Sequence, residues 1–175
     1  MKILQVFVFF VSINLISQDK FSFNENGVNP AYIVNNVKSK TQEELFTGSV
    51  KWVKKTYLNP DVEINTQIKN EEIRFTGIEK ACLKYKALGI EYSEDLKYVI
   101  SVSFKEGRYK FEPILLETRS ASGWTKINPK YYYKKNGKIK KIVKDYPQII
   151  SNLLNSINNK LLNFLINGSK NKDDW

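Results

Sequence analysis

Histidine is absent from the 175-residue chain, and cysteine occurs once, as Cys82. Without histidine, Ser-His-Asp and Cys-His catalysis and every His-ligated metal site are excluded. A single cysteine excludes an intramolecular disulfide, and we expect Cys82 to be a small buried apolar residue. Lys-Ser dyads and carboxylate pairs remain open, but no glycine-rich phosphate loop, metal-ligand cluster or nucleophile elbow is present. The chain is therefore predicted not to be an enzyme and to use no cofactor.

Arginine is scarce, with three residues against 25 lysines, although the formal net charge is +10. Arginine is the residue whose planar fork suits bidentate recognition of guanine and phosphate. Asparagine and isoleucine are also abundant, with 18 residues each. Lysine, asparagine and isoleucine all have AT-rich codons, so an AT-rich genome accounts for part of the lysine excess. The composition therefore argues against a surface that reads a nucleic-acid sequence, and no specific nucleic-acid partner is expected.

The chain also lacks an apolar run long enough to span a bilayer, which takes roughly 20 residues. Its most apolar stretch, residues 3–16, is interrupted by Gln5, Ser12 and Asn14. With Lys2 before it and the small Ser17 after it, this stretch is typical of a signal peptide over residues 1–17; the alternative is a buried N-terminal strand. No cysteine follows, so a lipoprotein anchor is not expected. We predict an exported protein, periplasmic or secreted, with no transmembrane segment after cleavage and a charge of +9.

The remaining length suits one domain. We expect a linker over residues 18–27, a single domain over 28–166 and a C-terminal tail over 167–175. A short strand is predicted over residues 31–37, followed by a helix over 39–57. Thr41 and Glu44 form the capping-box pattern at the start of this helix. Its apolar positions Phe46, Val50, Val53 and Tyr57 share one helical face.

Period-two alternation of apolar and polar residues predicts four strands between residues 62 and 112, each buried on one face. Residues 105–108 (KEGR) are expected to form a tight hairpin turn, and the loss of alternation after Pro113 predicts a bulge or an edge strand. Residues 79–92 fit neither period and are interpreted as an extended link.

A second helix is predicted after Asp145, which is expected to cap it. Its apolar stripe is Ile150, Leu153, Leu154, Ile157, Leu161, Phe164 and Leu165, and the opposite side carries Asn152, Asn155, Asn158, Asn159 and Lys160. The order of elements, β-α-β-β-β-β-α, predicts a two-layer α+β fold with a four- to five-stranded antiparallel sheet and both helices on one face.

Four stretches carry a family resemblance: KSKTQEELFTGSVKWVKKTY, IRFTGI, YVISVSFKEGRYKFEP and the closing amphipathic helix. Through them, residues 28–166 resemble a family of secreted bacterial proteins, a domain of unknown function with a TBP-like (TATA-binding-protein-like) fold. The resemblance implies the fold and an export signal, and it assigns no catalytic residue.

Fold does not imply function. DNA-binding sheets of the TBP type present basic and apolar side chains and wedge aromatic ones between base steps. The predicted outward face here is mixed and polar, without an aromatic wedge, and carries Glu63, Asn65, Gln67, Glu72, Thr76, Ser101, Ser103 and Glu112.

Eight lysines and no acid lie between Lys126 and Lys144. This basic segment (residues 126–144) has two interpretations: a solvated hairpin edge whose lysines block strand pairing, or a weak binding site for a polyanion or an anionic membrane surface. Asn136-Gly137 predicts a hairpin that pairs residues 130–135 with 138–143, with Tyr131 and Tyr133 turned toward the core. The candidate site residues are Lys134, Lys135, Lys138, Lys140, Lys141 and Lys144.

Trp124 is predicted to lie in a loop, either exposed as a binding residue or buried under the final helix. The leading hypothesis is a non-enzymatic exported binding or interaction domain whose partner is a protein or an anionic surface. An alternative is a carrier of an apolar small molecule between the sheet and the C-terminal helix. Its lining would be aromatic side chains that otherwise form the core: Tyr98, Phe104, Tyr109 and Phe111.

Overall fold

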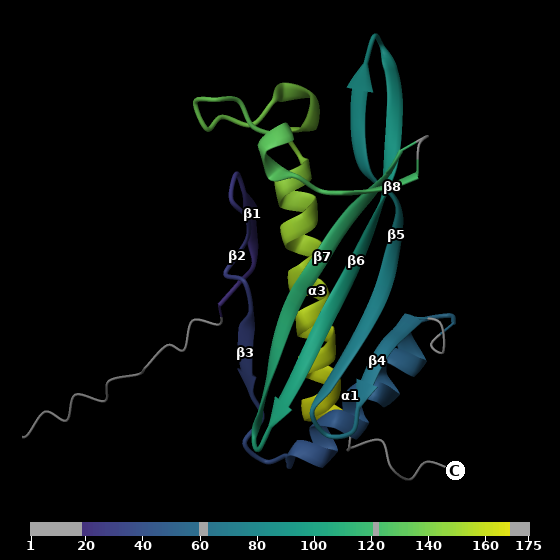
Figure 1. Cartoon of the computed structure of the whole chain (residues 1–175), viewed down its shortest axis with the longest axis vertical. Helices are drawn as coiled ribbons and strands as arrows, with labels where there is room; N and C mark the ends of the chain where they lie inside the picture. Colours follow the sequence, from purple (N-terminus) through teal and green to yellow (C-terminus); the bar gives the residue numbers. More distant parts are fainter. Residues whose placement is uncertain (1–18, 60–62, 121–122, 169–175) are drawn as a thin grey trace, which may run out of the picture.

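The computed structural model describes residues 19–59, 63–120 and 123–168, so the predicted signal peptide and all but the start of the predicted tail lie outside the described residues. The described residues form ten helices and strands and two short 3-10 turns (Figure 1). They are β1 (Ser22–Asn24), β2 (Gly27–Asn29), β3 (Ile33–Asn36), α1 (Gln42–Thr56), β4 (Ile64–Ile68), β5 (Glu72–Ala87), β6 (Ile90–Lys105), β7 (Arg108–Ser120), β8 (Gly123–Lys126), η1 (Pro129–Tyr131), η2 (Lys141–Val143) and α3 (Tyr146–Asn167).

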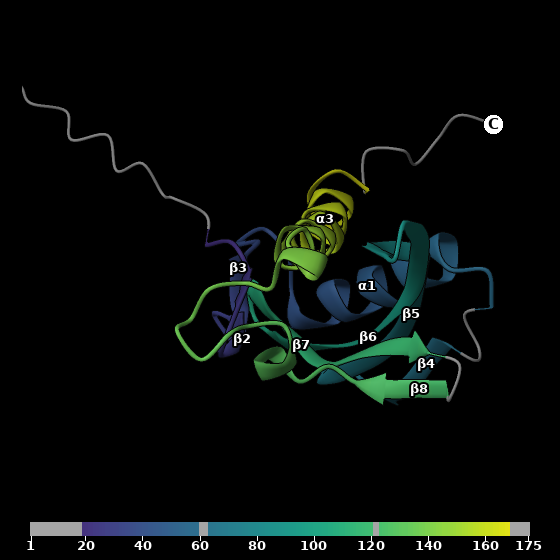
Figure 2. The ribbon, with the colours of Figure 1, turned by 90° about the horizontal axis from the view of Figure 1, so that it is seen from above.

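The main sheet is antiparallel, with the order β3-β7-β6-β5-β4, and β8 also pairs with β7. β3 and β8 share one edge of β7: β3 pairs with residues 108–111 and β8 with residues 117–120. Both helices lie on the same face of this sheet and leave the other face open (Figure 2). The predicted two-layer α+β fold is therefore confirmed, with six strands in the sheet because β8 adds to the predicted set.

Helix α1 begins with the predicted capping box. The Glu44 backbone N–H donates to Thr41 Oγ1 (3.2 Å), and the Thr41 N–H donates to Glu44 Oε2 (2.9 Å). Leu45, Phe46 and Val53 are buried against the sheet, since residues three and four apart share a helix face.

At Gly77 a side chain would collide with a neighbouring core residue. A Cβ atom on Gly77 in β5 would lie 2.3 Å from the Tyr98 ring on the neighbouring strand. The Tyr98 ring therefore lies directly over the Gly77 backbone, and its hydroxyl meets that of Tyr57 at 3.1 Å. Burial raises the pKa of Tyr57 above its usual range, so this hydroxyl pair stays protonated.

The N-terminal linker predicted for residues 18–27 is corrected by the structure. β1 pairs with β2, and Phe21 and Phe23 are buried in the core. The Phe21 N–H donates to Asn155 Oδ1 and its carbonyl accepts from Asn155 Nδ2, both at 2.8 Å, so α3 holds the strand through a side-chain amide. The polar surroundings of these two phenylalanines in the sequence concealed their burial, because the contact comes from the other end of the chain.

Strands β5 and β6 extend beyond the rest of the sheet as a two-stranded hairpin, here called the arm (residues 81–95) (Figure 1). The register shifts between Glu79 and Leu83, where Ala81 has φ of 50° and donates its N–H to Asp95 Oδ1 (2.8 Å). The interpretation of residues 79–92 as an extended link was thus incomplete. The bulge adds two residues to β5 relative to β6, and the exposed Glu79 and Ala81 interrupt the period-two pattern between Gly77 and Leu83.

The bulge predicted in the strand after Pro113 is confirmed. Ile100 pairs with Pro113 and Val99 with Leu115, so Ile114 is the extra residue. The predicted turn at residues 105–108 is also confirmed, with Gly107 at φ of 68°.

Candidate functional site

The basic segment is less regular than the predicted hairpin. One isolated bridge joins Tyr133 and Ile139, and the turn between them is closed by the Lys134 N–H donating to the Lys138 carbonyl (2.8 Å). On either side the chain forms the 3-10 turns η1 and η2 instead of strands. Pro129, which begins η1, fixes φ near the helical value and has no N–H for a strand ladder, so the pairing stops after one bridge.

The tyrosine prediction was wrong for Tyr131, which lies in η1; Tyr133, beyond η1, is half-buried, and its hydroxyl donates to the Phe23 carbonyl (3.5 Å). Tyr131 is 70% exposed, whereas the half-buried Tyr132 points inward. Its ring makes a T-shaped contact with Tyr146 at the start of α3 (5.4 Å between centroids) and lies 6.4 Å from Phe23. Tyr132 therefore anchors the basic segment to the core. The predicted cap of α3 is also corrected, since the Asp145 side chain makes no capping hydrogen bond.

The lysines of the basic segment all point into solvent. Each of the eight is exposed, and within the described ranges none of them forms an ion pair. They include all six candidate residues, Lys134, Lys135, Lys138, Lys140, Lys141 and Lys144. Nearby acids are Glu25 beside Gly137, Glu117 opposite Lys126, Glu91 across the hollow from Lys141, and Asp145, which follows the segment. The structure thus concentrates exposed positive charge on the segment between β8 and α3.

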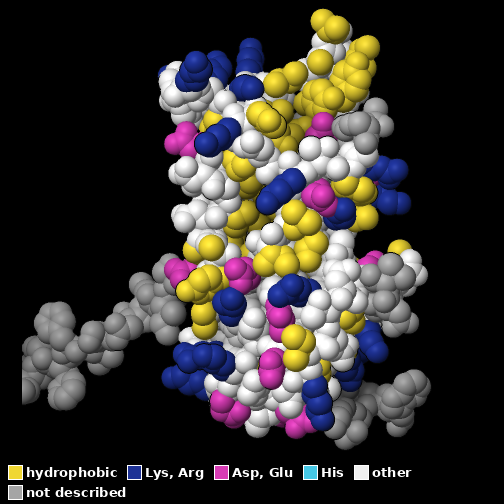
Figure 3. Space-filling model, viewed as in Figure 1, with side chains coloured by type: hydrophobic (Ala, Val, Ile, Leu, Met, Phe, Trp, Pro, Cys, Tyr) yellow, Lys and Arg dark blue, Asp and Glu magenta, His cyan; other side chains and the backbone are white. Residues whose placement is uncertain are grey.

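The arm and the basic segment lie side by side at one end of the molecule, here called the basic end (Figure 1). They border a hollow of about 480 Å³ lined by Lys84, Tyr85, Lys86, Glu91, Lys141, Ile142, Lys144 and Asp145. Figure 3 shows lysines on the basic segment and a dense apolar group on the arm. The arm's part in this site was not predicted from the sequence. The signal for it was KYKALGI, an apolar turn preceded by two lysines.

Trp124 lies in strand β8, not in a loop and not under the final helix. It is half-buried on the open face of the sheet, opposite Arg119. Lys97 Nζ lies 4.7 Å from the ring centroid, and the Arg119 guanidinium lies 5.9 Å away. These cation–π contacts and the Lys97–Glu117 ion pair hold the indole against the sheet. The open face therefore carries an aromatic side chain that the sequence analysis did not place there.

The aromatic residues proposed to line a ligand groove are core residues. Tyr98, Phe104, Tyr109 and Phe111 are all buried and fill the space between sheet and helices. A hollow of about 590 Å³ does lie between the end of α1, β5 and α3, but only Tyr98 of the four lines it. Charged residues also line this hollow: Glu63, Glu79, Lys80 and Lys160. The structure thus favours the core interpretation of these rings.

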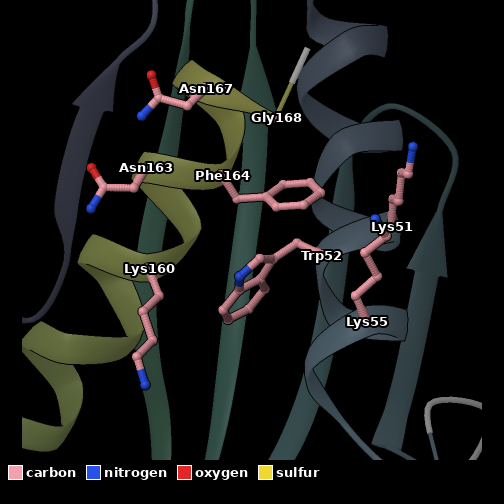
Figure 4. Close-up of a pocket in the computed structure, with 8 residues that line it drawn as sticks. All are labelled: Lys51, Trp52, Lys55, Lys160, Asn163, Phe164, Asn167 and Gly168. Atoms are coloured by element: carbon pink, nitrogen blue, oxygen red, sulfur yellow. The ribbon is translucent and has the colours of Figure 1, made fainter. Parts of the chain in front are cut away.

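A further hollow of about 540 Å³ separates α1 from the end of α3 (Figure 4). Trp52 and Phe164 project into it from opposite helices, and lysines stand at its rim. The side chains of Lys51 and Lys160 point away from each other, so their ammonium groups do not converge on one ligand (Figure 4).

The described residues include no group of three or more acidic or cysteine side chains placed to hold a metal ion. Cys82 is half-buried in the arm, and burial raises the pKa of its thiol, which lowers its reactivity. None of the described helices combines the length and apolarity needed to cross a bilayer.

The fold is shared with bacterial proteins of known structure. No family model and no curated protein matches the sequence. A DUF4468 family protein from Bacteroides ovatus is similar in structure, with a TM-score of 0.62 over 77% of this chain and 84% of that protein, at 13% sequence identity. A TBP-like protein from Parabacteroides distasonis is similar with a TM-score of 0.51 over 81% of this chain and 92% of that protein, at 17% identity.

The chain thus has a TBP-like α+β fold of a kind found in a bacterial domain of unknown function. The resemblance predicted from the sequence is confirmed at the level of the fold.

Proposed function

We propose that this protein is an exported, non-enzymatic binding domain that attaches to an anionic surface through its basic segment. The observation that carries the proposal is the basic segment itself, whose eight lysines are exposed and have no ion-pair partner among the described residues, and which Tyr132 anchors to α3. A loop that only blocked strand pairing would need neither so many charges nor an aromatic anchor to α3.

Two sequence features support the remaining parts of the proposal. The N-terminal 17 residues have the charge and apolar pattern of a signal peptide, which supports export. The absence of histidine and of nucleophile motifs supports a role in binding instead of catalysis.

Binding through lysines releases counterions, so it must weaken steeply with salt. We expect the protein to bind heparin and DNA of any sequence at low ionic strength and to bind both much more weakly at about 0.15 M salt, where charges are screened beyond about 8 Å. The measurement is a salt titration of binding to heparin, to one DNA duplex and to the same duplex with a scrambled sequence.

The variant Lys138→Glu/Lys140→Glu/Lys141→Glu should abolish this binding and leave folding intact. Its matched control reverses three exposed lysines on α1, as Lys51→Glu/Lys54→Glu/Lys55→Glu, which changes the net charge equally. Equal loss of binding in both variants would mean that total charge, and not the basic segment, binds the anion. Sub-micromolar binding at about 0.15 M salt with a sequence preference would replace the proposal with specific nucleic-acid recognition.

A further inference from the structure

The tip of the arm is apolar and fully exposed. Leu88 is 100% exposed and Ile90 is 57% exposed, and Tyr85 and Tyr92 stack below them with centroids 5.2 Å apart. A single exposed apolar side chain is common on protein surfaces, but a group of them at the end of a projecting hairpin marks an interaction site.

The backbone at this tip is also unusual for the residue that occupies it. Leu88 and Gly89 have φ of 50° and 83°, and Ala87 pairs with Ile90 across them. Positive φ at both central residues is typical of a type I′ turn, where asparagine before glycine is strongly preferred. Leucine in the left-handed region is sterically disfavoured, and an outlier of this kind is a reason to ask what the side chain does. Leucine at position 88 is therefore unfavourable in two ways: its backbone conformation is strained, and its apolar side chain is exposed to water. Asparagine would remove both penalties.

Positive charge surrounds the apolar tip. Lys84 and Lys86 flank it on β5, and Lys141 and Lys144 of the basic segment face the same hollow as the exposed Ile142. The acids at this end are Glu91, which lies 3.8 Å from Lys84 in an exposed pair, together with Glu94 and Asp95 of the arm, Asp145, and Glu25 beside Gly137. Tyrosine below an apolar tip matches the polarity of a membrane interface, where aromatic rings lie at the headgroup level.

We propose that the arm tip inserts Leu88 and Ile90 into the headgroup and upper acyl region of an anionic lipid bilayer while lysines of the basic end bind the lipid phosphates. This inference rests on the proposed function and specifies its surface as a lipid membrane. Charge complementarity selects an anionic surface, and the exposed apolar tip selects a bilayer over a polysaccharide or nucleic acid, which offer no apolar layer.

The test is co-sedimentation with vesicles of phosphatidylcholine containing about one third phosphatidylglycerol, compared with pure phosphatidylcholine vesicles and with heparin. Leu88→Asn should keep or raise the melting temperature because asparagine tolerates the turn. It should weaken binding to the anionic vesicles about tenfold, since part of a leucine side chain is no longer buried in lipid. Heparin binding should not change. Ile90→Thr, which retains a β-branched residue in the strand, is a second variant with the same expected direction.

Leu58→Asn is the matched control, because Leu58 is 96% exposed but lies after α1, far from the basic end (Figure 1). It should leave vesicle binding unchanged. Vesicle binding unaffected by both tip variants, or reduced no more than by Leu58→Asn, would overturn the insertion while leaving electrostatic attachment standing. Loss of heparin binding in the tip variants would also overturn it. A wild-type protein that binds neither heparin nor anionic vesicles at low salt would instead overturn the proposed function itself.

Discussion

Glu94 is a carboxyl group in largely apolar surroundings. It lies opposite Leu83 in the arm, and Tyr146 at the start of α3 donates to its Oε2 at 3.5 Å. Burial raises the pKa of Glu94, and the Tyr146 hydrogen bond offsets this only in part. A raised pKa means that the folded state binds the proton more tightly than the unfolded state. The free energy of unfolding therefore loses a contribution as the pH rises from the unfolded pKa of about 4.3 through the folded value.

Glu94→Gln should accordingly stabilise the protein at pH 7, because glutamine is neutral and retains an acceptor for Tyr146. The gain should disappear below about pH 4, where the glutamate is protonated in both states. Urea unfolding of both proteins at pH 7 and at pH 4 measures the difference. A variant that is less stable than the wild type at pH 7 would show that the charge of Glu94 is used favourably in the fold.

At the scale of elements, α3 has two roles. One side of the helix packs in the core, and side chains on another side hydrogen-bond to the backbone at β1. Asn155 binds both the N–H and the carbonyl of Phe21, and Ser151 Oγ accepts from the Phe23 N–H (2.9 Å). A side-chain amide has one donor and one acceptor group, so it can pair with a strand edge as another strand would. The asparagines expected on the solvent side of this helix thus include residues with structural contacts.

We expect Asn155→Ala to loosen the β1–β2 hairpin and to lower the free energy of unfolding by about 1–3 kcal/mol, since the Phe21 backbone loses both partners. Hydrogen exchange at the Phe21 amide should accelerate more than exchange in the centre of the sheet. Asn152→Ala is the control, because the Asn152 side chain is exposed and accepts from Gln148 Nε2 on the same helix. Equal protection of Phe21 in both variants would contradict the role assigned to Asn155.

The sequence predicts elements well where one local signal decides them. Thr41 and Glu44 mark the start of α1, and the stripe that includes Leu154 and Leu161 marks α3, because both patterns depend only on helix geometry. The sequence predicts an element poorly where distant contacts or a bulge determine its conformation. Pro129 ends strand pairing in the basic segment, and the bulge at Ala81 hides the arm. Half of the candidate site, the lysine loop, was therefore visible in the sequence, whereas the arm beside it was not.

At the scale of the whole molecule, α3 is the element that closes the core. It packs with α1 over one face of the sheet, and Leu154 and Leu161 are buried near its centre. The apolar face of the sheet would meet water without it, so the stability of the entire fold depends on this helix.

Leu154→Ala and Leu161→Ala should each lower the free energy of unfolding by about 2–5 kcal/mol, as buried leucine truncations do. Ile166→Ala on the same helix is the control, because Ile166 is about half exposed and should cost much less. Urea denaturation followed by far-UV circular dichroism measures all three. Unchanged midpoints for both leucine variants would mean that α3 does not pack on the sheet.

The contact between Phe21 and Asn155 joins residues 134 positions apart in the chain. A chain made from its N-terminus can bury Phe21, and can cover the apolar face of its sheet, only after α3 has been synthesised. Folds dominated by such distant contacts form slowly, because a long loop must close before the contact stabilises anything. Folding of this domain therefore cannot be completed before α3 has been made, and this delay leaves time for the export that we propose.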